Sequence, residues 1–149
     1  MEDSTRIWYV SEQTYIKGKQ ANIRTGLTET CTVVCSSPED DIYFGSSGSL
    51  LPGFSAKIVS SEGVEITEYD QPGELVVQSP SVVLGYLNNE KADKETFIDD
   101  TDGKGRWMRT GDEAVVRKSP KSGNEHIFIV DRIKELIKVK VRITPSCYP

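Results

Sequence analysis

The sequence predicts a mainly β fold with short helices, of the α+β class, and three observations lead to it. Residues 54–60 and 64–69 alternate apolar and polar side chains with the two-residue period of a strand. Glu74–Gln78 follows a Pro-Gly turn and is an expected third strand. Residues 114–118 and 126–130 flank a loop rich in Ser, Gly and Asn, so they predict a hairpin.

The N-terminal third contributes shorter expected elements. Ile7–Val10 is an expected short strand within a polar segment. The segment that follows Gly26-Leu27-Thr28 predicts a short helix near residues 29–35. Loops are expected at Pro38–Asp41 and Gly45–Ser49, where Pro, Gly, Asp and Ser gather.

The second half adds a helix and a strand. Residues 89–97 are polar and rich in Lys, Glu and Ala, which predicts a short helix. Asp99–Gly105 is an acidic loop that contains glycine. Near the C-terminus, residues 137–143 alternate apolar and basic side chains, which is typical of a strand with one face of each kind.

Composition limits the classes of function. The chain has 149 residues, 36% hydrophobic and 28% charged, which suits one globular domain. Its net charge of −5 argues against a nucleic-acid partner. No apolar run approaches the roughly 20 residues of a membrane span. Met1–Ser4 is acidic without a signal peptide, and Ser146–Pro149 is not a peroxisomal signal, so a cytoplasmic location is expected.

Reactive side chains give weak signals individually. The chain has three cysteines, Cys31, Cys35 and Cys147, and an odd number fits reduced thiols better than a set of disulfides. Cys31 and Cys35 could share a helix face, but two thiols alone make a poor metal site. His126, the only histidine, lies in an expected strand, which favours a structural role. Gly45–Ser49 lacks the Gly-Lys-Ser/Thr ending of a phosphate loop.

Five short motifs occur in a particular order along the chain. They are Gly26–Thr30, Gly73–Leu75 with Gly85–Leu87, Arg109–Asp112, Asp131–Glu135 and Leu136–Lys140. Together they resemble the later core motifs of the adenylate-forming (AMP-binding) superfamily. The resemblance covers roughly residues 25–140 and is nearest to acyl-CoA synthetases of the 4-coumarate-CoA ligase and luciferase group.

The resemblance implies an architecture. We expect a distorted β-barrel subdomain plus an edge of the adjoining α/β subdomain. Residues 1–24 are then a divergent N-terminal segment, residues 25–131 a partial AMP-binding (adenylation) domain, and residues 132–149 the hinge with a divergent C-terminal tail.

The resemblance also implies a reaction and its cofactors. A carboxylic acid substrate attacks the α-phosphate of ATP, giving an acyl-adenylate and pyrophosphate, and a thiol, usually that of coenzyme A, then takes the acyl group. Such chemistry depends on positioning and charge neutralisation, so ATP, Mg²⁺ and coenzyme A are the expected cofactors.

Three residues match the family's nucleotide and metal positions in the first part of the site. Thr28 would donate its hydroxyl to phosphate, as a catalytic and nucleotide-binding residue, and Glu29 would help to hold Mg²⁺, a cation that prefers carboxylate oxygen. A helix start is the alternative for both. Asp112 would accept hydrogen bonds from the ribose hydroxyls; a turn aspartate beside glycine is its alternative.

Three basic residues match family positions in the second part of the site, near the C-terminus of the chain. Arg132 resembles the residue that contacts the nucleotide, Lys134 the hinge about which the small C-terminal domain rotates, and Lys138 a residue that reaches the adenylate, which makes it a catalytic candidate. A solvated basic strand face is the alternative for Lys138.

The sequence departs from the family pattern at three places. Thr25 stands where the family has an aromatic residue that stacks on adenine, the upstream phosphate loop is absent, and similarity stops after Lys140 before the domain with the catalytic lysine. We therefore expect a fragment of a carboxylic acid:CoA ligase that is inactive alone, binds nucleotide weakly and self-associates through exposed edges. The alternatives are a non-catalytic binding or regulatory fragment and a pseudogene-like product.

Overall fold

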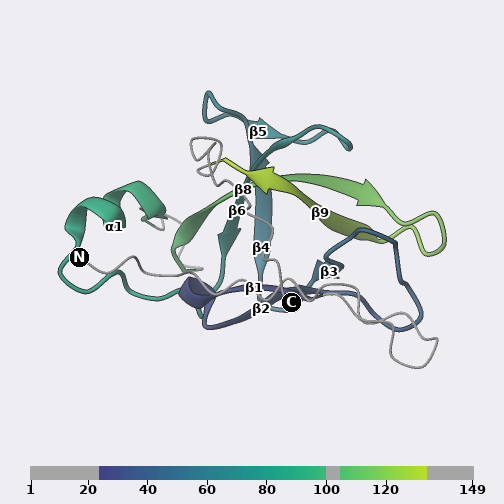
Figure 1. The fold of residues 1–149 in the computed structure, drawn as a ribbon, viewed down its shortest axis with the longest axis horizontal. Helices are drawn as coiled ribbons and strands as arrows, with labels where there is room; N and C mark the ends of the chain where they lie inside the picture. The colour runs from purple at the N-terminus through teal and green to yellow at the C-terminus, as the bar shows by residue number, and fades with distance from the viewer. Residues whose placement is uncertain (1–23, 100–104, 134–149) are drawn as a thin grey trace, which may run out of the picture.

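The computed structural model describes residues 24–99 and 105–133 and shows a curled sheet packed on a smaller one (Figure 1). The fold is therefore mainly β with little helix, as the sequence predicts. In chain order the elements are β1 (Arg24–Leu27), a 3-10 turn η1 (Thr28–Thr30), β2 (Thr32–Ser36), β3 (Ser49–Leu50), β4 (Ser55–Val59), β5 (Glu65–Ile66), β6 (Gly73–Gln78), α1 (Glu90–Thr96), β7 (Phe97–Ile98), β8 (Trp107–Lys118) and β9 (Glu125–Arg132).

All strand pairs in the two sheets are antiparallel. The small sheet has the order β1-β2-β3, and the large sheet has the order β5-β4-β6-β8, with β7 and β9 both pairing with β8. Strand β6 pairs with β8 from Trp107 to Ala114, whereas on the other edge β7 pairs with the beginning of β8 and β9 with its second half. On that edge, residues 109–111 in the middle of β8 therefore lie between the part that pairs with β7 and the part that pairs with β9.

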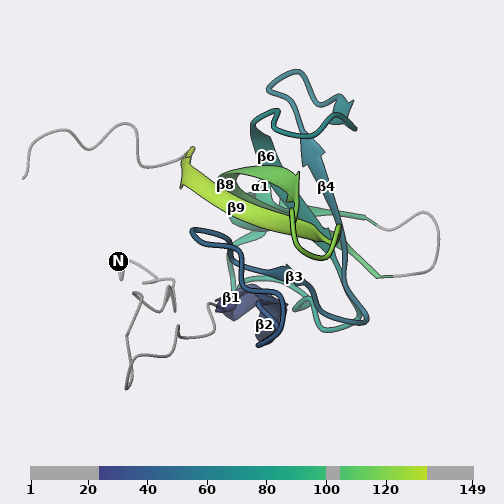
Figure 2. The ribbon, with the colours of Figure 1, turned by 90° about the vertical axis from the view of Figure 1, so that its right-hand side faces the viewer.

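The hydrophobic core lies between the sheets, which Figure 2 shows on either side of it. Val34 and Cys35 of the small sheet pack in one cluster with Leu75, Val77 and Met108 of the large sheet, and each of these side chains is at most 2% exposed. Such burial contributes roughly 1.5–3 kcal/mol for each large apolar side chain. The core thus fixes the central strands β6 and β8, which carry part of the site.

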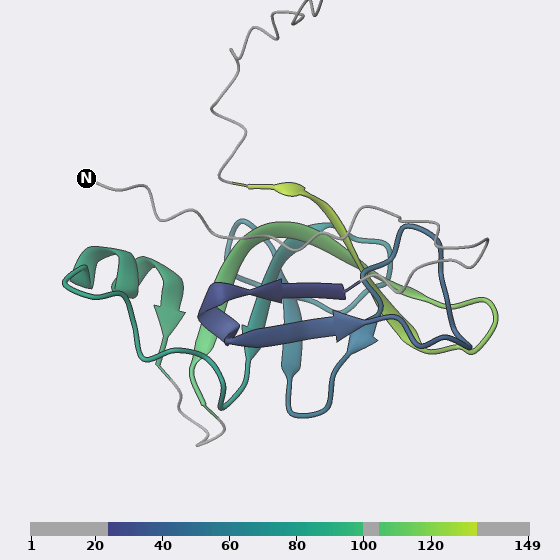
Figure 3. The ribbon, with the colours of Figure 1, turned by 60° about the horizontal axis from the view of Figure 1, so that its bottom comes forward.

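Most expected elements are confirmed, with shifted ends. The strands at residues 54–60 and 74–78 appear as β4 and β6, and the helix at 89–97 appears as α1, whose first turn is capped by the Asn89 side chain accepting from Ala92 N at 3.2 Å. Figure 3 shows α1 set apart from the curled sheet. The expected strands at 7–10 and 137–143 lie outside the described residues, as does Cys147.

The helix expected near residues 29–35 is wrong. The chain makes a single 3-10 turn, takes a left-handed conformation at Cys31 (φ 58°), and continues as strand β2. The run Thr32-Val33-Val34 is β-branched, so it favours a strand. Cys31 and Cys35 consequently share no helix face, and burial raises the pKa of the Cys35 thiol to about 12, which keeps it neutral.

The surface of the described part carries a few large apolar side chains. Leu84 and Leu87, which flank the Gly85-Tyr86 pair, are 90% and 92% exposed. Within residues 24–99 and 105–133, no helix is long and apolar enough to cross a bilayer. The expected self-association through exposed edges stays a prediction.

Candidate functional site

The Arg109–Asp112 motif forms a bulge in the middle of β8. Glu74 of β6 is opposite Glu113, whereas Val76 is opposite Arg109, so Leu75 alone faces three residues of β8. A bulge of this kind bends a strand and redirects its side chains, and bulges are frequent beside active sites. Gly111 has φ 74°, a left-handed conformation that glycine adopts without a Cβ penalty. The motif therefore continues the strand while turning Asp112 out of register.

Side chains of the motif fix the bulge against β6. Thr110 Oγ1 donates to Leu75 O at 2.8 Å and accepts from Asp112 N at 3.1 Å. The Glu74 carboxylate accepts from Gly111 N at 3.2 Å through Oε1, and from Arg109 at 2.9 and 2.5 Å through Oε2. The same carboxylate raises the pKa of the Arg109 guanidinium.

Strand β9 fixes the other side and brings Arg132 to Asp112. Asp112 is opposite Arg132, with Arg132 Nε 3.7 Å from Asp112 Oδ1, and Ile133 N donates to Gly111 O at 3.0 Å. The Asp112 carboxylate is buried, at 1% exposed. Three of the sequence motifs, around Glu74, Asp112 and Arg132, thus meet at one bulge.

A second cluster gathers around Glu29 in the 3-10 turn. Glu29 is 4% exposed, and its Oε1 accepts from the Tyr86 hydroxyl at 2.7 Å. Glu29 O also accepts from Val83 N at 2.8 Å, and Asp93 of α1 accepts from Tyr86 N at 2.6 Å. The Gly85–Leu87 motif therefore meets the Gly26–Thr30 motif, held there by α1.

Thr28 and Thr25 differ in exposure. Thr28 is an exposed residue at the start of the 3-10 turn. Thr25, in the family's aromatic position, is 7% exposed and paired with Cys35 in the small sheet. The neighbouring Gly26 is tightly placed, because a Cβ there would come within 2.8 Å of Thr32 O.

The described residues offer only single carboxylates as possible metal ligands. Residues 24–99 and 105–133 contain no group of three or more His, Cys, Asp or Glu side chains that could hold a metal ion. Mg²⁺ commonly uses one or two protein carboxylates and takes its other ligands from water and phosphate. Glu29 fits a metal held in that way. Lys134 and Lys138 lie outside the described residues.

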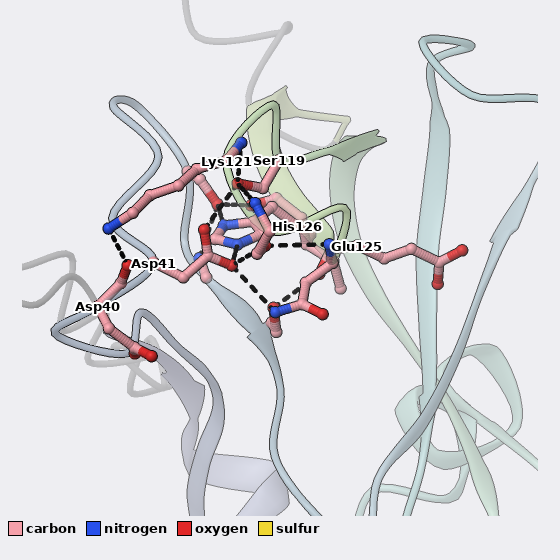
Figure 4. A network of polar contacts seen from close by, with 12 residues as sticks. Asp40, Asp41, Ser119, Lys121, Glu125 and His126 are labelled. Atoms are coloured by element: carbon pink, nitrogen blue, oxygen red, sulfur yellow. Dashed lines mark hydrogen bonds and ion pairs between the residues drawn. The ribbon is translucent and has the colours of Figure 1, made fainter.

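A third polar cluster is centred on Asp41 and joins its loop to the β8–β9 hairpin (Figure 4). Its Oδ1 accepts from Ser119 Oγ at 2.6 Å, and its Oδ2 accepts from Ser122 Oγ, from Asn124 Nδ2 at 3.1 Å and from His126 Nε2 at 3.0 Å. The donors, with Ser119 the strongest, hold the pKa of the Asp41 carboxyl well below its ordinary value of 3.8.

In the same cluster, the side chains of Ser46, His126 and Asp41 contact one another in this order. Ser46 Oγ lies 3.0 Å from His126 Nδ1 and also donates to Ile127 O. Ser46 and His126 are 0% exposed and Asp41 is 3% exposed, so a substrate has no access to the hydroxyl. The cluster is a structural connection between two loops, which agrees with the structural role that the sequence favoured for His126.

Two contributors had no role assigned from sequence. Tyr86 and Glu74 belonged to recognised motifs, but only the structure shows their bonds to Glu29 and Gly111. Their positions inside these motifs were the only indication in the sequence that they belong to the site. Asp41 gave no such signal, because it lies in a loop with other acidic residues.

Comparison with known proteins gives a consistent result. The model of the AMP-binding enzyme family matches residues 15–87. An acyl-CoA ligase, AFT1-1 of Alternaria alternata, is 55% identical over 115 residues, which are 77% of this chain and 20% of that protein. The acyl-CoA ligase lcsD of Purpureocillium lilacinum is 47% identical over 122 residues, which are 81% of this chain and 30% of that protein.

Solved structures share the fold. O-succinylbenzoate coenzyme A synthetase (MenE) from Bacillus subtilis, in complex with ATP and magnesium ion, matches with a TM-score of 0.64 and 27% identity, over 79% of this chain and 22% of that one. The chain thus spans between a fifth and a third of the length of these three proteins.

Proposed function

Since the chain belongs to the AMP-binding enzyme family, we propose that it forms the ribose and magnesium part of the nucleotide site of an ATP-dependent carboxylic acid:CoA ligase. The observation that carries the proposal is the bulge of β8, where motifs from β6, β8 and β9 converge on a buried carboxylate. A carboxylate held in this way can accept two hydroxyl donors at once. Relatives named as acyl-CoA ligases support the reaction class.

Asp112 and Arg132 are the proposed nucleotide contacts. Asp112 would accept from the ribose hydroxyls, and Arg132, at 27% side-chain exposure, would turn from Asp112 toward the nucleotide. Arg132 Nε lies 3.7 Å from Asp112 Oδ1, and the ribose hydroxyls would replace the guanidinium as donors to the buried Asp112 carboxylate.

Thr28 and Glu29 are the proposed phosphate and metal contacts. The exposed Thr28 hydroxyl would donate to phosphate, and Glu29 would supply one oxygen to Mg²⁺, whose charge would offset that of the phosphates. Lys134 as the hinge and Lys138 as a catalytic residue, together with coenzyme A and the carboxylic acid substrate, are proposed from the family likeness.

Nucleotide binding tests the proposal directly. We expect ATP with Mg²⁺ to bind weakly, because Thr25 offers no ring to adenine and a lost aromatic contact costs on the order of 1 kcal/mol. Asp112→Asn should weaken binding further, by about tenfold, since one acceptor becomes a donor. NMR titration measures both constants. Glu113→Gln, which removes one charge at the next position, is the matched control and should leave affinity unchanged; equal effects of the two variants would reject the ribose role of Asp112.

Catalysis is tested separately. Exchange of labelled pyrophosphate into ATP that depends on a carboxylic acid would show that the chain carries out adenylation by itself. Binding without exchange would favour a binding fragment.

Tyr86→Phe is expected to weaken the magnesium dependence of ATP binding. The variant removes the 2.7 Å hydrogen bond to Glu29 and keeps the ring that packs near Phe97. A hydrogen bond to a charged group contributes about 1.5–3 kcal/mol, so the ratio of ATP affinities with and without Mg²⁺ should fall several-fold. Tyr69→Phe removes a matching bond to Glu125, at 2.6 Å on the surface, and should leave the ratio alone. An unchanged ratio in Tyr86→Phe would contradict the role of Glu29.

A further inference from the structure

We propose that Glu74 is a positioning residue that sets the conformation of Asp112 by holding the backbone of the β8 bulge. The proposal rests on the proposed function, because it concerns the nucleotide contact made by Asp112. Glu74 lies on a different strand, 37 positions before Gly111, and nothing in its own motif assigns it a task.

The bulge needs an external support because its own ladder is interrupted. Between Glu74 and Val76, strand β6 supplies only Leu75 against Thr110, Gly111 and Asp112. In this stretch the Gly111 N–H is directed toward β6. Here the Glu74 carboxylate accepts that N–H at 3.2 Å, in a part-buried position. A buried backbone donor without an acceptor costs about 1–3 kcal/mol, so this contact favours the bulged conformation.

The two peptide groups around Gly111 are fixed from opposite sides. Glu74 accepts from the N–H of the peptide group before Gly111, and Ile133 N donates at 3.0 Å to the carbonyl of the one after it. Together they define the left-handed conformation of Gly111 (φ 74°), and this conformation directs the next residue, Asp112. Releasing the first contact removes one restraint on the Gly111 peptide, while the bond from Asp112 N to Thr110 Oγ1 remains, and so loosens the position of the Asp112 carboxylate.

The ion pair with Arg109 has a subordinate part in this arrangement. The Glu74 side chain is 11% exposed, whereas that of Arg109 is 51% exposed. A pair with one partner so open to water contributes little to stability. Its two bonds occupy Oε2 and so leave Oε1 directed at Gly111. Arg109 thus orients Glu74, and Glu74 orients the bulge.

The test measures how well the chain distinguishes ribose hydroxyls. NMR titrations compare the dissociation constants of 2′,3′-dideoxy-ATP and ATP, each with Mg²⁺. The wild-type chain is expected to prefer ATP about tenfold. Glu74→Thr, a short side chain suited to a strand, should bring this ratio close to one while leaving the affinity for the dideoxy compound unchanged. Glu74→Gln keeps an acceptor oxygen and should retain most of the preference. Glu113→Gln removes a charge from the residue opposite Glu74 and should behave as wild type.

Amide hydrogen exchange at Gly111 gives a second readout that needs no nucleotide. Exchange should accelerate about tenfold in Glu74→Thr and change little in the two Gln variants. A Thr variant that keeps both the wild-type preference and the wild-type exchange rate overturns the proposal. If the wild-type chain binds ATP and 2′,3′-dideoxy-ATP equally well, the ribose role of Asp112 is rejected instead. The exchange rates at Gly111 then decide by themselves whether Glu74 holds the bulge. If Glu74→Thr does not fold, Glu74→Asp, whose carboxylate is one methylene shorter and so falls short of Gly111 N, takes its place. A lower preference or faster exchange in Glu74→Asp than in Glu113→Gln supports the proposal, and wild-type values of both overturn it.

Discussion

Asp41→Asn is expected to lower the thermal midpoint of unfolding strongly at neutral pH, and the deficit should shrink as the pH falls below about 3.8. The carboxylate accepts hydrogen bonds from Ser119, Ser122, Asn124 and His126. An amide turns one acceptor into a donor that faces other donors, so bonds are lost inside the protein.

The pH dependence follows from the direction of the pKa shift. The folded-state pKa of Asp41 lies below its unfolded value, so its contribution is present in full above about pH 3.8 and is lost as the pH falls further. Thermal melts of the wild-type chain and the variant from about pH 6 to pH 3 measure the difference. Asp40→Asn, an exposed neighbour, is the control. A deficit that stays constant across this range would contradict the assignment.

Gly48→Ala is expected to be one of the most damaging single substitutions in the chain. Gly48 has φ +94°, and a Cβ there would lie 2.1 Å from the Ser36 carbonyl carbon and 2.3 Å from its oxygen. The chain must therefore separate backbone segments that pair on both sides, since Ile127 N also donates to Gly48 O at 2.9 Å. Left-handed strain costs about 1–2 kcal/mol, and the collision adds about 3 kcal/mol or more.

A second glycine separates the two causes. Gly53 has φ +90°, but no atom lies within 4 Å of the position that a Cβ would take there, so Gly53→Ala carries the strain without the collision. Urea unfolding of the two variants gives their free energies of unfolding. The difference between them measures the close approach at Gly48. Equal losses would show that the segment shifts without cost and that the contact with Ser36 is not tight.

Local patterns predicted the fold well where one segment determined its own structure. Alternation predicted β4 and β5, the Pro-Gly turn before Glu74 predicted β6, and the polar stretch rich in Lys, Glu and Ala predicted α1. The helix expected near residues 29–35 is wrong because the β-branched run Thr32-Val33-Val34 favours the strand β2 after a single 3-10 turn. The length of β8 was also missed, since Gly111-Asp112 suggests a turn and only pairing with β6 and β9 carries the strand through it.

The candidate site divides in the same way. Thr28, Glu29, Asp112 and Arg132 were named from motifs, and the structure brings Asp112 and Arg132 together. The bonds from Tyr86 to Glu29 and from Gly111 to Glu74 join positions 57 and 37 residues apart. Contacts of that separation depend on tertiary packing, which no local periodicity encodes.

The Asp41 cluster also bears on the order in which the chain folds. It joins a loop to the β8–β9 hairpin across 78 to 85 residues, whereas β4, β6 and their neighbours close over much shorter distances. Closing a long loop costs entropy that only later contacts repay. We therefore expect the strands from β4 to β9 to assemble first and the segment from Asp41 to Gly48 to dock on them afterwards. Buried polar contacts at that junction make this last step specific, since an apolar surface there would accept the segment in several registers.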